Sequence, residues 1–368
     1  MEPTEPLKHA FCQTDNLDHE HWHQRGNLYR NQTVRFGKPE DIQEAIECYS
    51  RALDLTPDGH SDLPSRYADL GVSYSDRYRR LGAIDDLEKS IQCKTYALNL
   101  TPDGHPHLPS RHASLGASYS DRFRRLGAID DLEKSIQYFS RTLDLTPDGH
   151  PDLSSCHADL GVSYGDRYRR LGSIDDLEKS IQCLSRALDL TPDSHPDLPS
   201  RHADLGVSYG DRYRRMGTIE DLEKSIQCLS HALDLTPDGH LDLPSRHADL
   251  GVSYGDRYRR LGATDDLEKS IECRTRALNL TPDGHPDLPF RHANLGVSYG
   301  DRYRRLGTID DLEKSIEFRA RALKLTPEGH PHLPSRHADL GVSRSNAKLA
   351  HSTSLPTATH TCHPAMLL

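Results

Sequence analysis

The chain has 368 residues, a net charge of −10 that is spread along its length, and an apolar fraction of 35%. This composition is too apolar for a disordered chain, and its mildly acidic balance argues against general binding to nucleic acid or to membranes. No stretch of ten residues is uniformly apolar, and the first residues lack the basic start and apolar core of a signal peptide. We therefore expect a cytoplasmic protein, with the nucleus as the alternative compartment.

Residues 1–17 show no helical pattern and are expected to form a disordered N-terminal segment. The string HEHWH follows at His19–His23 and matches the zinc-protease motif HExxH. A catalytic zinc needs a third ligand and an apolar cleft, whereas the flanks of this motif are polar. We interpret the segment as the first turn of a helix that buries Trp22, and we expect no metal, no cofactor and no enzyme activity.

From this point the chain repeats itself with a period of 45 residues. The dipeptide Thr-Pro marks the period, at Thr56, Thr101, Thr146, Thr191, Thr236, Thr281 and Thr326. Repetition at a fixed interval indicates a solenoid, in which each unit contacts only its neighbours. Fold and function must therefore be derived for one unit and then applied to the others.

Each unit begins with a predicted helix, represented by residues 198–216. Apolar side chains recur there at spacings of three and four, from His202 to Met216, which is a helical stripe. Gly217 follows the stripe at the position where a helix favours a left-handed residue. Gly206 lies inside the helix, where it lowers helix propensity, and we expect it to allow close approach of a neighbouring helix.

The second predicted helix of the unit covers residues 220–235, with its own stripe of leucine and isoleucine. In most units this segment opens with Asp-Asp-Leu-Glu, and Asp175 and Glu178 predict a capping box there. Thr-Pro-Asp-Gly ends the segment, because proline cannot continue a helix and Asp-Gly turns the chain. The unit is therefore a helical hairpin without strands.

Counting the units predicts an all-α, right-handed solenoid of seven hairpins plus a truncated eighth, over residues 18–343. The eighth unit starts at Pro334, its repeat text fails after Ser343, and residues 344–368 are expected to be a disordered tail. A last helix without its partner leaves an apolar face open, so we expect self-association through the C-terminal end. A truncated gene product is one hypothesis for this ending.

The order of key residues in the unit resembles the tetratricopeptide (TPR) repeat, on the evidence of Leu205, Gly206, Tyr209, Ser225, Leu229, Ala232 and Pro237. Trp22 stands where that pattern has tryptophan. The family period is 34, so each unit here has eleven extra residues, seven near the hairpin and four in the Pro-Asp-Leu-Pro linker. HEAT and armadillo repeats have closer periods but lack this residue order.

The phrases LTPDGHPDLP and RYRRLGAIDDLEKSI are similar to long-unit TPR arrays of mushroom-forming fungi. Those arrays often precede a caspase-like CHAT domain, and kinesin-light-chain TPRs are a looser match. The resemblance implies a non-catalytic scaffold for protein–protein interaction. The alternative is the regulatory or sensor arm of a CHAT-type protease or immune-type receptor whose effector domain is missing from this chain.

In TPR proteins the first helices line a concave face, and the resemblance places protein or peptide binding there. The residues implied by this comparison are Ala158, Val162, Gly165, Asp166, Arg169, Ala203, Val207, Gly210, Asp211, Arg214, Ala248, Val252, Gly255, Asp256, Arg259 and Asn294. The TPR clamp for C-terminal carboxylates needs lysine and asparagine on this face, so we do not expect chaperone-tail binding.

Four other patterns recur with the period, and we interpret all of them as structural. Histidine pairs such as His195 with His202 are predicted to be turn and core residues rather than metal ligands. Arginine clusters such as Arg214–Arg215 are predicted to pair with acids of the Asp166 and Asp175 types rather than with phosphate. Tyrosine pairs one turn apart are expected in the core. A further core register holds Cys48, Cys93, Tyr138, Cys183, Cys228, Cys273 and Phe318, and we expect its thiols to be reduced.

Overall fold

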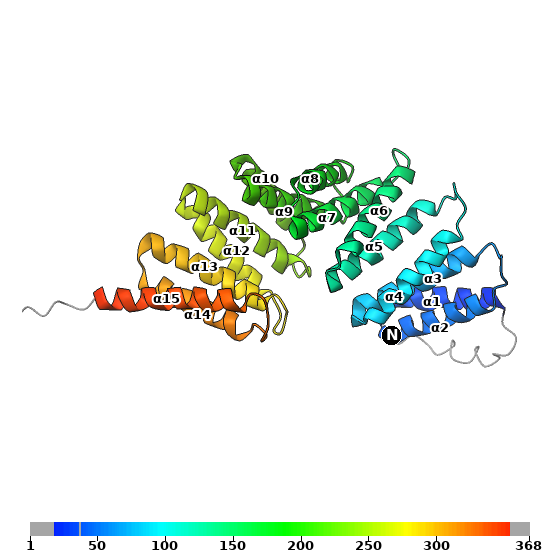
Figure 1. The fold of residues 1–368 in the computed structure, drawn as a ribbon, viewed down its shortest axis with the longest axis horizontal. Helices are drawn as coiled ribbons and strands as arrows, with labels where there is room; N and C mark the ends of the chain where they lie inside the picture. Colours follow the sequence, from blue (N-terminus) through cyan, green and yellow to red (C-terminus); the bar gives the residue numbers. More distant parts are fainter. Residues whose placement is uncertain (1–17, 37, 354–368) are drawn as a thin grey trace, which may run out of the picture. The chain divides into compact units, whose positions relative to one another are not determined.

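The computed structural model describes residues 18–36 and 38–353, and every regular element within them is a helix. Consecutive helices form hairpins, which Figure 1 shows in chain order. The chain divides into two compact units, residues 1–191 and 192–368. The predicted fold of seven helical hairpins followed by one further first helix is confirmed for the described residues.

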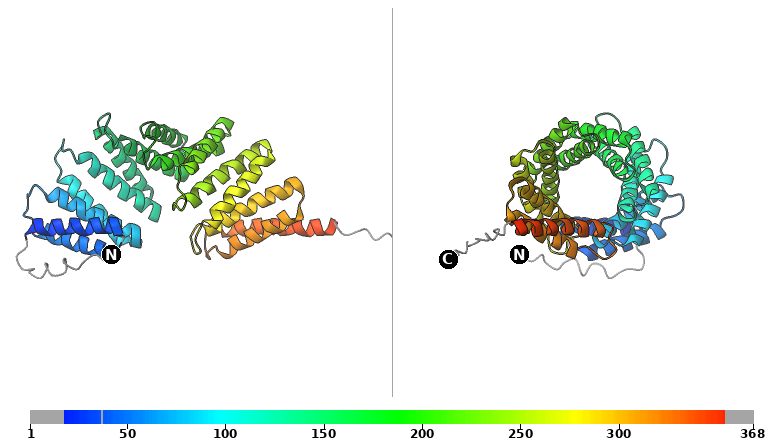
Figure 2. Two further views of the ribbon diagram at one scale, coloured as in Figure 1. Left: turned by 180° about the vertical axis from the view of Figure 1, so that it is seen from behind. Right: turned by 60° about the vertical axis from the view of Figure 1, so that its left-hand side comes forward.

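The described part of the first unit contains four hairpins, and the second contains three hairpins and a last helix (Figure 2). The helices of the first unit are α1 (His19–Phe36), α2 (Pro39–Asp54), α3 (Leu63–Leu81), α4 (Ile84–Asn99), α5 (Leu108–Leu126), α6 (Ile129–Leu145), α7 (Leu153–Leu171) and α8 (Ile174–Asp189). The helices of the second unit are α9 (Leu198–Met216), α10 (Ile219–Asp234), α11 (Leu243–Leu261), α12 (Thr264–Asn279), α13 (Leu288–Leu306), α14 (Ile309–Lys324) and α15 (Leu333–Thr353). Odd-numbered helices are called first helices below, and even-numbered helices are called second helices.

The turn inside each hairpin forms as the sequence predicts at its glycine. Gly217 ends α9 with φ 78°, a left-handed conformation, and its N–H donates to the carbonyl of Tyr213. The predicted capping box is wrong, since α8 begins at Ile174 and no side chain caps it. Asp175 therefore lies inside the first turn, and the neighbouring Asp176 binds Arg167 of α7 instead.

Close packing of the two helices explains the glycine inside each first helix. A Cβ atom at Gly206 would lie 2.8 Å from Cγ of Leu229, so only glycine permits this approach of α9 to α10. Leu205, Leu222 and Leu229 are buried around the contact. At the turn end, Met216 is 56% exposed, so its prediction as a core residue is wrong, because no helix covers the last turn of α9.

The final helix extends further than the sequence predicts. Helix α15 runs to Thr353, ten residues beyond the expected end at Ser343, while residues 354–368 lie outside the described part. The segment RSNAKLAHST contains neither proline nor glycine and is rich in helix formers, so nothing in it stops the helix. Helix α15 packs on α14 through Leu340, which is buried.

Candidate interaction surface

The first helices carry a repeated series of ion pairs that we call the Asp–Arg ladder. In the first unit it consists of Asp76, Arg79, Asp121, Arg124, Asp166 and Arg169. In the second unit it consists of Asp211, Arg214, Asp256, Arg259, Asp301 and Arg304. Each pair links either two positions of one helix or two neighbouring first helices of the same unit.

The geometry of the ladder is clearest on α9 and α11. Arg214 lies 2.7 Å from Asp211 on its own helix and 3.3 Å from Asp256 on the next first helix. Arg259 repeats the arrangement, at 2.8 Å from Asp256 and 3.5 Å from Asp301. The carboxylates are mostly buried, whereas the side chain of Arg214 is 42% exposed. The ladder thus presents guanidinium groups whose charge is already matched by carboxylates beneath them.

The other predicted partner-binding residues lie at different depths beside the ladder. Ala158 is buried, and the remaining alanines and valines are half-buried, as is Asn294 on α13. The three glycines are covered by second helices, since a Cβ atom at Gly165, Gly210 or Gly255 would lie 3.1–3.2 Å from a serine hydroxyl oxygen. Arg169 is exposed and bonds Asp166 at 2.6 Å. The accessible part of the predicted surface therefore consists of small apolar side chains and arginines.

A second arginine in each hairpin from α3–α4 to α13–α14 forms a partly buried ion pair across the hairpin. Arg257 of α11 donates to both carboxylate oxygens of Asp266 on α12, at 3.0 and 2.6 Å. These hydrogen bonds raise the pKa of Arg257 and outweigh the opposing effect of its burial. The same pair recurs as Arg77–Asp86, Arg122–Asp131, Arg167–Asp176, Arg212–Asp221 and Arg302–Asp311. The sequence had predicted Asp175-type acids as the cross-hairpin partners, and the neighbouring Asp176-type acids take that place.

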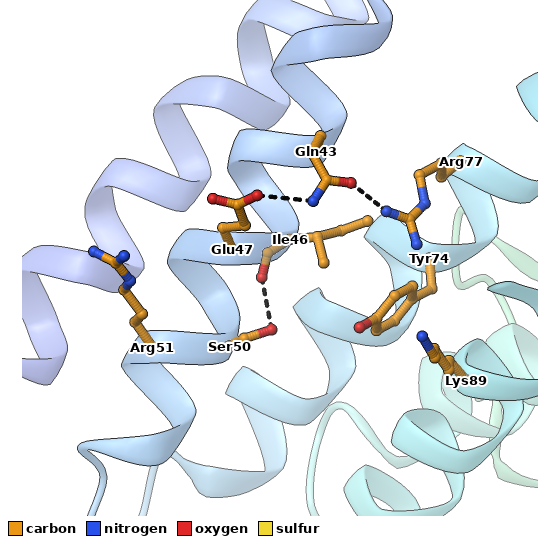
Figure 3. Close-up of a pocket in the computed structure, with 8 residues that line it drawn as sticks. All are labelled: Gln43, Ile46, Glu47, Ser50, Arg51, Tyr74, Arg77 and Lys89. Carbon is orange, nitrogen blue, oxygen red and sulfur yellow. Dashed lines mark hydrogen bonds between the residues drawn. The ribbon is translucent and has the colours of Figure 1, made fainter.

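The arginine of this pair also stacks on a tyrosine ring that a lysine covers from the second helix. Figure 3 shows this arrangement at Tyr74, with Arg77 5.4 Å and Lys89 5.6 Å from the ring centroid. Tyr74, Arg77 and Lys89 help line an open pocket of about 550 Å³, where Arg77 also donates a hydrogen bond to Gln43 of α2. Gln43 also donates to Glu47, and Ser50 donates to the carbonyl of Ile46. Tyr74 and Tyr78 pack against core clusters, as predicted for the tyrosine pairs.

The residues of the HEHWH motif have structural partners. His23 Nε2 lies 2.9 Å from Asp69 Oδ2, and Glu20 pairs with Arg66 at 3.2 Å. Trp22 is buried with Cys48 and Ala52, as predicted. Residues 18–36 and 38–353 contain no cluster of three histidine, cysteine or acidic side chains arranged to hold a metal.

The histidine pairs also have structural partners. His195 Nδ1 accepts a hydrogen bond from the backbone N–H of Asp197 in a turn, while the His202 ring packs against the His231 ring at a tilt of 38°. Burial lowers the pKa of His202. The cysteine register packs as predicted, with Cys93, Cys183 and Cys273 against core clusters, and burial raises the pKa of Cys93 to about 11. Six cysteines of the described chain are free thiols, namely Cys48, Cys93, Cys156, Cys183, Cys228 and Cys273.

Sequence reasoning missed two sets of buried cations. An arginine near the start of most first helices is buried, for example Arg66 and Arg246, although both lie in a polar stretch of sequence. Lys94 and Arg274 are buried on second helices at the register where α8 and α10 have leucine. Serines at the contact between helices accept hydrogen bonds from both, so the recurring serine register was the available signal.

No helix in the described residues is long and apolar enough to cross a membrane. The tetratricopeptide repeat family model matches residues 248–287, which run from α11 to the loop before α13. No curated protein sequence matches the chain significantly. The matched repeat is therefore similar to the tetratricopeptide type, and the other repeats of the chain have closely similar sequences.

Solved structures with similar folds are TPR proteins. The C-terminal part of a TPR repeat-containing protein from Cytophaga hutchinsonii has a TM-score of 0.50 and 12% identity, over 87% of this chain and 99% of that chain. Nearly identical TPR-like repeats of a kinesin-light-chain protein from Podospora anserina have a TM-score of 0.41 and 13% identity, over 59% and 98%. YrrB, described as a TPR protein with an unusual peptide-binding site, has a TM-score of 0.39 and 13% identity, over 65% and 95%.

Proposed function

We propose that this chain is a non-catalytic scaffold that binds a protein or peptide through the surface of its first helices. We assign this role to residues 18–353, since α15, the last helix packed on the array, ends at Thr353. The observation that carries the proposal is the Asp–Arg ladder, which repeats the same half-exposed guanidinium beside small apolar side chains. A partner that spans several units gains from each contact made after the first.

The chemistry of this surface favours a polypeptide partner. Small residues such as Ala203 and Val207 leave room for a peptide backbone, and guanidinium N–H groups can donate to its carbonyl or carboxylate oxygens. Binding to nucleic acid is disfavoured because it depends on unmatched positive charge, and the ladder arginines are paired with carboxylates. An extended or helical segment is the expected occupant.

The test compares two double variants. One removes the first arginine and the other removes the second arginine of the adjacent pairs Arg214–Arg215 and Arg259–Arg260. Arg214→Ala with Arg259→Ala removes two ladder guanidiniums, whereas Arg215→Ala with Arg260→Ala removes their exposed neighbours. Affinity capture from the producing cells, followed by mass spectrometry, should identify partners that the ladder variant loses and the control variant keeps. Identical partner sets for wild type and ladder variant, with unchanged melting, would contradict the proposal.

A further inference from the structure

One contact between repeat units lacks a side chain that the others contain. Each first helix from α3 onward has an arginine at its fourth residue, except that α7 has a cysteine. The register consists of Arg66, Arg111, Cys156, Arg201, Arg246, Arg291 and Arg336. All six arginines are buried, with at most 9% exposure. The space that the arginine side chain occupies in the other contacts therefore has no arginine beside Cys156.

Arg246 shows what this space contains elsewhere. One guanidinium nitrogen donates to the carbonyl of Ala232, at 3.1 Å, and to the hydroxyl of Thr236, both at the end of α10. The other donates to Ser200 Oγ of α9 at 3.2 Å and to Asp242 Oδ2 at 3.4 Å. At an equivalent position, Arg291 also donates to the carbonyl of a proline, Pro244. Taken together, these two interfaces show two carbonyls, two hydroxyls and one carboxylate as acceptors for the arginine of this register.

The same acceptors are present around Cys156. They are the carbonyls of Thr142 and Pro109, the hydroxyls of Thr146 and Ser110, and the carboxylate of Asp152. We call this set, together with Cys156, the guanidinium slot. The cysteine sulfur lies 3.8 Å from Thr146 Oγ1 and carries no N–H groups, so it cannot replace the hydrogen bonds of arginine.

A cavity occupies the place of the missing side chain. All residues of the slot line a cavity of about 640 Å³ formed by α5, α6, α7 and their loops. At the equivalent contact of α15, where Arg336 is present and Phe290 replaces the serine, the corresponding cavity measures about 490 Å³. Thr142 donates to the carbonyl of Pro109 at 3.4 Å, and a carbonyl oxygen can accept a second hydrogen bond. The slot thus combines space with available acceptors.

The charges around the cavity select the ligand. Its described lining contains the carboxylates of Asp152 and Asp159 and three histidines, but no lysine or arginine, and His150 Nδ1 lies 3.9 Å from Asp152 Oδ2. A cation is therefore favoured over an anion. Among cations, a guanidinium offers five N–H donors in a planar fork, whereas an ammonium offers three donors around a point. The acceptors here are those that hold a planar fork in the neighbouring interfaces.

We propose that the slot at Cys156 binds a guanidinium group supplied in trans, as the side chain of an arginine in a partner protein. The partner's arginine takes the position that Arg246 and its equivalents fill from within the chain. The assignment of the arginine to a protein rests on the proposed scaffold function. The slot itself rests only on its own contacts, so the two can fail separately.

The experiment titrates the full chain with N-acetyl-arginine amide while NMR follows the labelled threonine methyl groups. Saturable shifts are expected at Thr142 and Thr146, with none at Thr236, whose slot Arg246 already fills. N-acetyl-lysine amide, the matched cation, should bind at least about tenfold more weakly. Equal affinities for the two compounds, or no saturable shift with the arginine compound, overturn the proposal.

Two variants separate binding from folding. Cys156→Arg installs the residue found in the other interfaces and should abolish the shifts without lowering the melting temperature. Arg246→Cys should open a second slot and produce ligand-dependent shifts at Thr236. Binding that survives Cys156→Arg overturns the assignment of the site.

Two further comparisons identify the source of the guanidinium. Free L-arginine carries a carboxylate near Asp152 and Asp159, so it should bind more weakly than the amide. Tighter binding of the free amino acid overturns the protein source in favour of a small molecule. Affinity capture should recover proteins that wild type retains and Cys156→Arg loses. Saturable NMR binding without any captured protein supports the slot and counts against the scaffold function.

Discussion

At the scale of single residues, the buried lysine on α4 is the most unusual group. Lys94 donates to Ser75 Oγ at 2.8 Å, to Ser118 Oγ at 2.7 Å and to the carbonyl of Ser114 at 3.3 Å. Burial lowers its pKa to about 7, and nearby Arg79 acts in the same direction. Asp121 and Asp76 of the ladder act in the opposite direction. Folding therefore opposes the charged form of this lysine.

Because folding disfavours the charged lysine, the effect of Lys94→Leu on the free energy of unfolding should depend on pH. In the unfolded chain the lysine has a pKa of roughly 10.4, so between about pH 7 and 10 the unfolded state binds more protons than the folded state. The free energy of unfolding therefore rises with pH across that window. Below about pH 7 the buried lysine is charged and destabilises the folded protein by its full amount. Replacement by leucine, the residue of α8 and α10, should stabilise the protein by about 1–4 kcal/mol at pH 6 and by less at pH 9.5.

Urea unfolding at the two pH values measures the difference. The exposed Lys134 provides the control, and Lys134→Leu should show no comparable change between them. A stabilisation by Lys94→Leu that does not vary with pH would contradict the assigned charge state.

Some residue roles could be predicted from the local sequence, and others could not. Arg214 and Asp211 lie three positions apart on one helix, so their pairing follows from helical spacing. The burial of Arg246 does not, because two of its acceptors, the carbonyl of Ala232 and the hydroxyl of Ser200, belong to α10 and α9, and no spacing within α11 shows them. The periodicity of the sequence predicts that a charged residue lies on the surface. Its burial becomes visible only when the neighbouring repeat is packed against it. The empty position at Cys156 was undetected for the same reason.

At the scale of the helices, the hairpin was predictable because glycine, proline and apolar spacing all mark it independently. The start of α8 was misplaced because Asp175 was assigned as the cap, whereas the helix begins at Ile174 and both aspartates lie in its first turn, where Asp176 pairs with Arg167. The end of α15 was misplaced because a break in the repeat text was read as a break in helix structure. Loss of similarity to a repeat does not by itself lower helix propensity.

The hairpin core predicts a large loss of stability for Leu205→Asp. Leu205 is 4% exposed between α9 and α10, so the substitution buries a charge without a partner and should cost several kcal/mol. The exposed Gln227 on the facing helix provides the control, and Gln227→Ala should stay within about 0.5 kcal/mol. Thermal and urea unfolding measure both, and similar effects would show that the helix faces are assigned wrongly.

In α15, we expect a substitution at the buried Leu340 to destabilise the protein and a truncation after it to have little effect. Leu340→Ala removes the main apolar contact of α15 with α14 and should cost about 2 kcal/mol, seen as faster amide exchange in α14. Removal of residues 346–368 should leave that exchange nearly unchanged, since residues 346 and 348 are exposed and 347 is only half-buried. Faster exchange in α14 after this truncation would mean that the end of the chain stabilises the array.

At the scale of the whole molecule, stability comes from contacts repeated along the chain and not from one central core. The core clusters are separate, and the buried residues of the clusters around Ile42 and around Leu222 come from one second helix and the next first helix of the same unit. Such arrays unfold according to the stability of each unit and of its contacts with its neighbours. A bound metal has no role in this scheme.

The native protein is therefore expected to contain no stoichiometric zinc, and a chelator should not change its melting temperature. The reason is local, because His23 binds Asp69 and Glu20 binds Arg66, which leaves the HEHWH motif committed to packing. Metal analysis after native purification tests this expectation. Zinc that disappears in a His19→Ala or His23→Ala variant would restore the protease hypothesis.

The contacts between units have one consequence for how such a gene can change. Arg66, Arg111 and Arg291 each reach a backbone carbonyl 47 positions earlier in the chain. Duplication or loss of a whole 45-residue segment of the gene preserves this offset and brings equivalent surfaces together. Loss of residues 243–287, for example, would dock α13 on α10 through the side chains that α11 uses now. The length of the array can therefore evolve by recombination between its own copies, whereas insertions of any other size disrupt an interface.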